Sequence, residues 1–264
     1  MIQIDDPDDP RIAAYRAVRE RDVVGRGERF VAEGEVVLRL LLGDSSRHQA
    51  ESVLIAESRV AGLEPLLGAA GPVPVYVASP AVMDAIVGFH IHRGVLAIGR
   101  RAPAEDAAAL LARLPPRALV VALVGVSNHD NVGGVFRNAA AFGADAVLLD
   151  GASCDPLYRK AIRVSVGASL VTPFARGGSG GELLDALADA GFTTFALSPS
   201  GELTLEEARP AARTCVMLGA EGPGLPHALM ARATTVRIPM AHGFDSLNVA
   251  TTSGIALYRL ARGA

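Results

Sequence analysis

The chain has 264 residues, of which half are hydrophobic and a fifth are charged, and its formal net charge is −3. This composition excludes intrinsic disorder, and it gives no overall basic character for binding nucleic acid. The longest apolar run, residues 118–126, is too short to span a bilayer and the first residues are acidic, so we expect a globular cytoplasmic protein that does not bind membranes.

In the first hundred residues, apolar runs alternate with helical periodicity, as is typical of an α/β domain. A helix is expected to open at Pro10. The predicted strands are residues 29–33, 52–56, 73–78 and 94–99, and the predicted helices are residues 34–42, 58–67 and 80–87. Residues 1–100 are therefore predicted to form one domain, followed by a partly helical linker at residues 101–117, where prolines interrupt the pattern.

Residues 118–264 are predicted to form a second α/β domain. Its predicted strands are residues 118–125, 145–149, 170–174, 192–197, 214–219 and 234–238. Its predicted helices are residues 132–142, 156–165, 182–190, 225–231 and 246–261. The strands are almost continuously apolar, which favours a parallel sheet covered by helices on both faces.

Motifs of several common sites are missing from the sequence. It has neither a glycine-rich dinucleotide fingerprint nor a P-loop, and Lys160 is its only lysine. Cys154 and Cys215 form no CxxC pair, and His90 and His92 have no third ligand nearby. We therefore expect no metal site.

The first of three informative motifs, NHDNVGGVFRNAAAFG at residues 128–143, directly follows a predicted strand. Asp130 or Asn131 is expected to cap the helix that begins there. A buried stripe at helical spacing is predicted for Val132, Phe136, Ala139 and Phe142. Arg137 lies on a neighbouring face of small residues, where it either forms an ordinary salt bridge or meets an anionic ligand.

The other two motifs lie late in the chain. LGAEGPGLP at residues 218–226 ends a strand, which is where parallel sheets bind ligands, although a plain tight turn would also fit. Its glycines leave the backbone open to a flat ligand. IPMAHGFDSLNVA at residues 238–250 precedes a last helix that is rich in small residues, with Ser246 as the expected N-cap.

Together and in this order, the three motifs closely resemble those of the SpoU (TrmH-like) family of RNA ribose 2′-O-methyltransferases in the SPOUT superfamily. The resemblance covers residues 118–264, and residues 25–99 are similar to the ribosomal-protein-like RNA-binding domain of many members. It implies a deep trefoil knot, a homodimer formed through the C-terminal domain, and S-adenosylmethionine as cofactor. The implied partner is RNA, with 23S ribosomal RNA favoured over transfer RNA.

The resemblance also assigns the site residues. The cofactor contacts would be Leu197, Ser198, Gly219, Glu221, Gly222, Gly224, Ile238, Met240, Leu247 and Asn248. The catalytic residues would be Arg137, Asn131, Glu221, Ser246 and Asn248. A free guanidinium has a pKa above about 12, so we interpret Arg137 as a phosphate ligand that favours the developing alkoxide rather than as a base. Asn131 and Asn248 would orient the ribose or Arg137, and Glu221 would pair with Arg137.

Local basic clusters are the candidates for RNA contact. The predicted RNA-binding residues are Arg29, Arg159, Lys160 and Arg163, although a solvated helix face would look the same. Two other functions stay open at this point. One is a non-catalytic RNA-binding or ribosome-assembly protein that keeps the fold, and the other is an unrelated α/β enzyme that uses a nucleotide.

Overall fold

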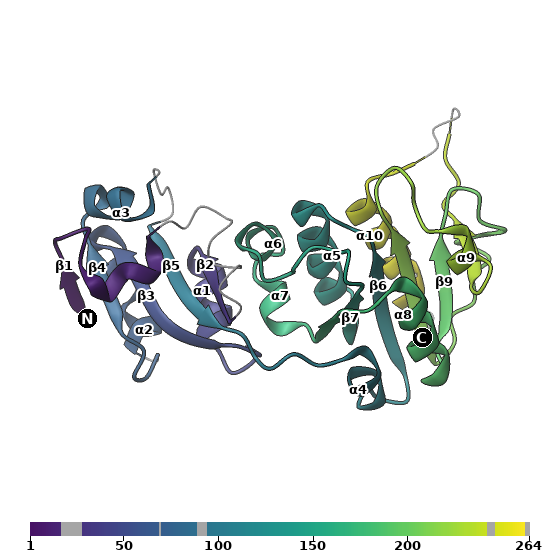
Figure 1. The fold of residues 1–264 in the computed structure, drawn as a ribbon, viewed down its shortest axis with the longest axis horizontal. Helices are drawn as coiled ribbons and strands as arrows, with labels where there is room; N and C mark the ends of the chain where they lie inside the picture. Colours follow the sequence, from purple (N-terminus) through teal and green to yellow (C-terminus); the bar gives the residue numbers. More distant parts are fainter. Residues whose placement is uncertain (17–27, 69, 89–93, 242–245, 262–264) are drawn as a thin grey trace. The chain divides into compact units, whose positions relative to one another are not determined.

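The computed structural model describes residues 1–16, 28–68, 70–88, 94–241 and 246–261. They divide into two compact units, each built around its own sheet (Figure 1). The first unit comprises Met1–Pro103 with Leu157–Val171, and the second comprises Ala104–Pro156 with Thr172–Ala264. The segment 157–171, predicted as part of the second domain, thus makes its contacts within the first unit.

The first unit has a mixed sheet in the order β1-β4-β3-β5-β2, in which β5 runs antiparallel to both of its neighbours. The strands are β1 (Ile2–Ile4), β2 (Arg29–Glu33), β3 (Gln49–Ala56), β4 (Val75–Ala78) and β5 (Val95–Arg100). The helices are η1 (Pro10–Tyr15), α1 (Glu35–Leu42), η3 (Glu57–Arg59), α2 (Val60–Gly68), α3 (Pro80–Val87), α6 (Arg159–Val164) and α7 (Ala168–Val171). Tyr15, Leu54 and Met83 are buried together where η1 and α3 cover the sheet.

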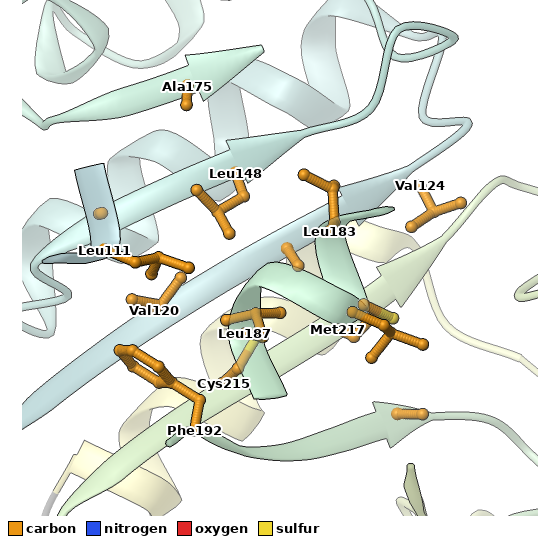
Figure 2. Packing of buried hydrophobic residues seen from close by; sticks show 14 of the residues in the cluster. Leu111, Val120, Val124, Leu148, Ala175, Leu183, Leu187, Phe192, Cys215 and Met217 are labelled. Carbon is orange, nitrogen blue, oxygen red and sulfur yellow. The ribbon is translucent and has the colours of Figure 1, made fainter. Parts of the chain in front are cut away.

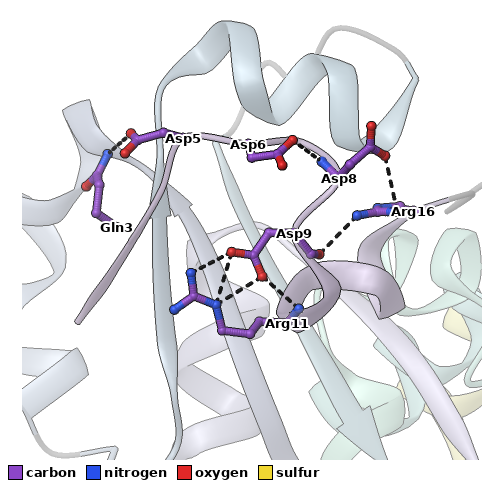
Figure 3. Close-up of polar contacts among 7 residues, drawn as sticks. All are labelled: Gln3, Asp5, Asp6, Asp8, Asp9, Arg11 and Arg16. Atoms are coloured by element: carbon purple, nitrogen blue, oxygen red, sulfur yellow. Dashed lines mark hydrogen bonds and ion pairs between the residues drawn. The ribbon is translucent and has the colours of Figure 1, made fainter.

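Two acids of the N-terminal segment, Asp8 and Asp9, are paired with arginines (Figure 3). Asp9 caps η1 by accepting a hydrogen bond from the Arg11 backbone nitrogen at 2.8 Å. The guanidinium of Arg11 also binds this carboxylate and lowers the pKa of Asp9 to about 2. Asp8 pairs with Arg16 at 3.2 Å. These two arginines therefore serve the local structure of the first unit.

The second unit has a parallel sheet in the order β10-β12-β9-β11-β6-β7-β8, which confirms the predicted α/β class with a parallel sheet. Its strands are β6 (Ala118–Val124), β7 (Ala146–Leu149), β8 (Phe174–Arg176), β9 (Thr193–Leu197), β10 (Leu203–Thr204), β11 (Arg213–Gly219) and β12 (Thr234–Arg237). Its helices are α4 (Ala107–Ala112), α5 (His129–Ala141), α8 (Gly180–Asp189), α9 (His227–Met230) and α10 (Val249–Ala261).

One face of this sheet forms the core shown in Figure 2, where Val120 and Met217 pack against Leu111 of α4 and Leu183 of α8. A capping box fixes the start of α8. Ser179 Oγ accepts from the Glu182 backbone nitrogen at 3.2 Å, and the Glu182 carboxylate accepts from the Ser179 nitrogen at 2.7 Å, which lowers the pKa of Glu182. The helices α5 and α10 pack against each other, and α10 also contacts β11.

Two stretches differ from the sequence predictions. The strand expected at residues 170–174 is wrong, because residues 168–171 form α7 and the strand β8 begins at Phe174. A short apolar run without alternation does not distinguish a strand from a buried helical turn. The expected linker contains α4, whose Leu110 and Leu111 are completely buried in the second unit. Within the described ranges, no helix has the length and apolar composition needed to cross a bilayer.

Candidate functional site

A pocket of about 670 Å³ lies at the carboxyl ends of the adjacent strands β12, β9 and β11. Its lining comes from residues 197–200 at the end of β9, residues 218–225 at the end of β11, the segments before α10, and the first turn of α10. Because parallel strands end at the same edge of a sheet, loops that are far apart in the sequence meet there. The whole pocket is built from the second unit.

All of the predicted cofactor contacts line this pocket. They are Leu197, Ser198, Gly219, Glu221, Gly222, Gly224, Ile238, Met240, Leu247 and Asn248. The predicted catalytic residue Ser246 lines it as well, whereas Asn131 and Arg137 lie on α5 outside the lining. Thr252 of α10 also lines the pocket, although the motifs did not single it out.

The loop after β11 folds back on itself. The Gly224 nitrogen donates to the Ala220 carbonyl at 3.0 Å. A Cβ on Gly219 would lie 2.4 Å from the backbone of Gly224 and Leu225, so no larger residue fits that position without moving the loop. The same turn holds Glu221 at the surface beside the pocket.

A chain of side-chain hydrogen bonds joins the three sequence motifs. Asn131, which is only 4% exposed, donates from Nδ2 to the Glu221 carboxylate, and its Oδ1 accepts from Asn248 Nδ2 at 2.8 Å. Glu221 thus accepts from Asn131, and the predicted ion pair with Arg137 is not formed among the described residues. This arrangement fixes the loop after β11 to the starts of α5 and α10.

The helix caps differ from those expected. Asn128, rather than Asp130 or Asn131, caps α5 by accepting from the Asp130 nitrogen at 2.8 Å. Asn248, rather than Ser246, caps α10, because its Oδ1 accepts from the nitrogens of Ala250 and Thr251 at 2.9 and 3.2 Å. The predicted last helix began three residues too early, which placed the cap on the wrong polar residue.

Arg137 and its neighbour Asn138 have different surroundings. Arg137 is exposed, and its guanidinium pairs with no carboxylate in the part of the chain that the structure describes. Asn138 donates to the Ala250 carbonyl at 2.7 Å and to Ser253 Oγ at 2.9 Å, which links α5 to α10. Sequence reasoning missed Asn138, although its place beside Arg137 within the first motif was a usable signal.

The predicted RNA-binding residues lie in the first unit. Arg29 pairs with Glu51 at 2.6 Å and is half exposed. Arg159 and Arg163 on α6 both approach Glu33 of β2, at 3.4 and 3.8 Å, and Arg159 is only 14% exposed. Lys160 lies on the same helix. Arg159 is therefore held by an acid inside the unit, whereas Arg163 is more open to solvent.

Neither the two cysteines nor a cluster of metal-ligating side chains provides a reactive centre among the described residues. Burial raises the pKa of the Cys154 thiol to about 11 and that of the Cys215 thiol further, so both are protonated at neutral pH. Among the described residues, no three His, Cys, Asp or Glu side chains lie close enough to hold a metal ion. His90 and His92 lie outside the described residues.

Comparison with known proteins gives consistent matches. The family model described as the SpoU rRNA Methylase family matches residues 118–258. An uncharacterized tRNA/rRNA methyltransferase of Mycobacterium bovis is 40% identical over 97% of this chain and 90% of its own length. A solved RNA 2′-O ribose methyltransferase is 28% identical, with a TM-score of 0.79 over 99% of this chain and 98% of that one. An AdoMet-bound rRNA methyltransferase of Sinorhizobium meliloti, 24% identical, has a similar fold, with a TM-score of 0.81 over 98% of this chain and 97% of that one.

Proposed function

Because the chain belongs to the SpoU rRNA methylase family, it is an RNA methyltransferase, and we propose that it transfers the methyl group of S-adenosylmethionine to a ribose 2′-hydroxyl of structured RNA. The observation that carries this proposal is the single pocket that gathers all of the predicted cofactor contacts. The similarity to a solved RNA 2′-O ribose methyltransferase supports the ribose oxygen as the acceptor.

The pocket suits S-adenosylmethionine in size and chemistry. Its volume of about 670 Å³ falls in the range of roughly 300–1,000 Å³ that is usual for small-ligand sites. The buried side chains of Leu197, Leu218 and Leu225 form apolar walls, and the glycine-rich backbone of residues 219–224 can receive a flat purine ring. When bound, the cofactor supplies a methyl group on a positively charged sulfur, which leaves as a neutral thioether.

Arg137 is assigned to the RNA side of the reaction. An arginine side chain is permanently charged and offers parallel donors that match a phosphate group. Its exposed position on α5 leaves the guanidinium open to the phosphate of the target nucleotide. There it also stabilises the negative charge that develops on the 2′-oxygen as the hydroxyl proton passes to bulk water.

Asn131, Glu221 and Asn248 are assigned to positioning. Their hydrogen bonds hold the loop after β11 against the starts of α5 and α10, so the pocket keeps its shape when RNA arrives. Ser246, exposed at the pocket, is assigned to contact with the ribose.

The proposal includes a homodimer formed through the second unit and a trefoil knot near the C-terminus. In support of the dimer, Leu247, Ile255 and Tyr258 expose large apolar side chains at or near α10, at 41%, 39% and 48%. Ile255 and Tyr258 are three residues apart on α10 and so share one side of the helix. Exposed apolar residues on one face favour an interaction site. In support of the knot, small residues in α10 allow close packing against α5, which a threaded chain requires.

The first unit is assigned to binding RNA, with 23S ribosomal RNA favoured over transfer RNA as the substrate in the cytoplasm. Half-exposed Arg29 and the partly exposed Arg163 support this assignment. Guanidinium groups suit phosphate contacts on a structured stem-loop that is recognised by its shape.

Incubation of the purified protein with methyl-labelled S-adenosylmethionine and either ribosomal or transfer RNA tests the proposal. We expect labelled 2′-O-methylnucleosides after digestion of the RNA, with ribosomal RNA as the better acceptor. Label on a base would contradict the 2′-O assignment. RNA binding without cofactor binding or transfer would instead indicate a non-catalytic assembly protein.

A further inference from the structure

Asn138 joins the two helices of the proposed site through two hydrogen bonds from one amide. Its Nδ2 donates to the Ala250 carbonyl at 2.7 Å and to Ser253 Oγ at 2.9 Å. Ser253 is completely buried, and its hydroxyl donates in turn to the Ala250 carbonyl at 2.7 Å. Both N–H groups of the amide are therefore directed from α5 to α10.

Small residues bring the helices close enough for these bonds. A Cβ on Gly134 would lie 2.6 Å from the Cβ of Ala250, and a Cβ on Gly254 would lie 3.2 Å from Asn138 Nδ2. A side chain at Gly134 would therefore require the two helices to shift, whereas one at Gly254 would require the Asn138 amide to move by a few tenths of an ångström. The packing thus sets the distance between α5 and α10, and the Asn138 amide sets how one helix is aligned along the other.

This alignment matters because the helices carry different parts of the proposed site. Arg137 precedes Asn138 on α5, whereas Val249 and Thr252 on α10 line the pocket. Arg137 has no carboxylate partner among the described residues that would hold its guanidinium in place. The backbone position of Arg137 relative to the pocket therefore depends on how α5 is fixed to α10.

We propose that Asn138 is a positioning residue for methyl transfer, an inference that rests on the proposed function. Its amide fixes the alignment of α5 on α10 and thereby the base of the Arg137 side chain relative to the pocket. Because no residue of α5 lines the pocket, loss of the Asn138 amide leaves cofactor binding intact and misplaces only the arginine. A displacement of about 1 Å in such an arrangement is enough to lower a rate by roughly a hundredfold.

The test compares Asn138→Ala and Asn138→Asp with the wild-type protein at saturating RNA and S-adenosylmethionine. Asn138→Asp keeps the shape of the side chain but loses both donors. We expect kcat to fall roughly 10- to 100-fold in both variants, while the Kd for S-adenosylmethionine, measured by calorimetry, stays close to the wild-type value. Ser253→Ala keeps the hydrogen bond from Asn138 to the Ala250 carbonyl, so it should give a smaller loss of kcat. It replaces Asn138→Ala as the test variant if Asn138→Ala does not fold.

Ser179→Ala is the control for stability, because it removes the cap of α8 in the same unit without touching α5 or α10. We expect it to lower the melting temperature and to leave kcat unchanged. Wild-type kcat in the Asn138 variants, or an equal loss of kcat in Ser179→Ala, would overturn the inference and leave the proposed function standing. A wild-type protein that transfers no methyl to RNA would overturn both.

Discussion

Asn248 combines two roles in one side chain. Its Oδ1 accepts from the backbone nitrogens of Ala250 and Thr251, which satisfies donors that the start of a helix would otherwise leave unpaired. Its Nδ2 donates to the buried Asn131, which in turn holds Glu221. Capping and site positioning are thus separable by substitution, because an aspartate can accept like asparagine and cannot donate.

Asn248→Ala should lower the free energy of unfolding by about 1 kcal/mol, because the cap is lost. Asn248→Asp should be more stable than Asn248→Ala, since a carboxylate caps well and is favoured at a helix N-terminus. Both variants should lose methyl transfer through the missing bond to Asn131. Urea denaturation and initial rates measure the two effects, and equal stability of the two variants would show that Asn248 is not the cap.

Gly219→Ala should abolish S-adenosylmethionine binding. The added Cβ would lie 2.4 Å from the backbone of Gly224 and Leu225, so the pocket loop must open to accept it. Gly181→Ala is the matched control, because its Cβ would meet only ordinary contacts, the nearest being Ser179 Oγ at 3.7 Å. Calorimetric titration of both variants checks this, and tight binding by Gly219→Ala would mean that the loop does not form the cofactor site.

At the scale of elements, regular periodicity made the fold predictable. The strand at residues 29–33 and the helix at residues 80–87 agree with β2 and α3. A short run that ends before Gly34 marks the strand, and the Ser79 cap and the Gly88 end mark the helix. The strand expected at residues 170–174 was wrong, since tertiary burial and not local preference makes residues 168–171 helical. The short β1 and β10 were missed, because two or three residues carry no periodicity.

The packing of α6 on β2 depends on Glu33. Glu33→Gln should destabilise the first unit by roughly 1–3 kcal/mol, because the nearly buried Arg159 would lose the charge of the Glu33 carboxylate, while the more exposed Arg163 contributes less. Glu51→Gln is the control. Its partners Arg29 and Arg100 are half exposed, so the loss should stay below about 1 kcal/mol. If urea denaturation gives the same loss of unfolding free energy for both variants, the structural role of Glu33 is contradicted.

At the scale of the whole molecule, the sequence alone could not show which loops meet. Periodicity places Leu197, Gly219 and Ile238 at strand ends, but only the strand order brings those ends to one edge of the sheet. From the sequence alone, the prediction of the site depends on the family resemblance. The contacts of residues 157–171 with the first unit were also unpredictable, because they join segments more than a hundred residues apart. The functional division into RNA-binding and methyltransferase domains stays a prediction.

The most direct test of the account is a map of 2′-O-methyl sites in total RNA from cells with and without this protein. We predict that a defined ribose methylation, in ribosomal RNA, disappears without the protein and returns with the wild-type chain. It should not return with Arg137→Ala, although that variant should still bind S-adenosylmethionine. An unchanged map of ribose methylation, or full restoration by Arg137→Ala, would contradict the account.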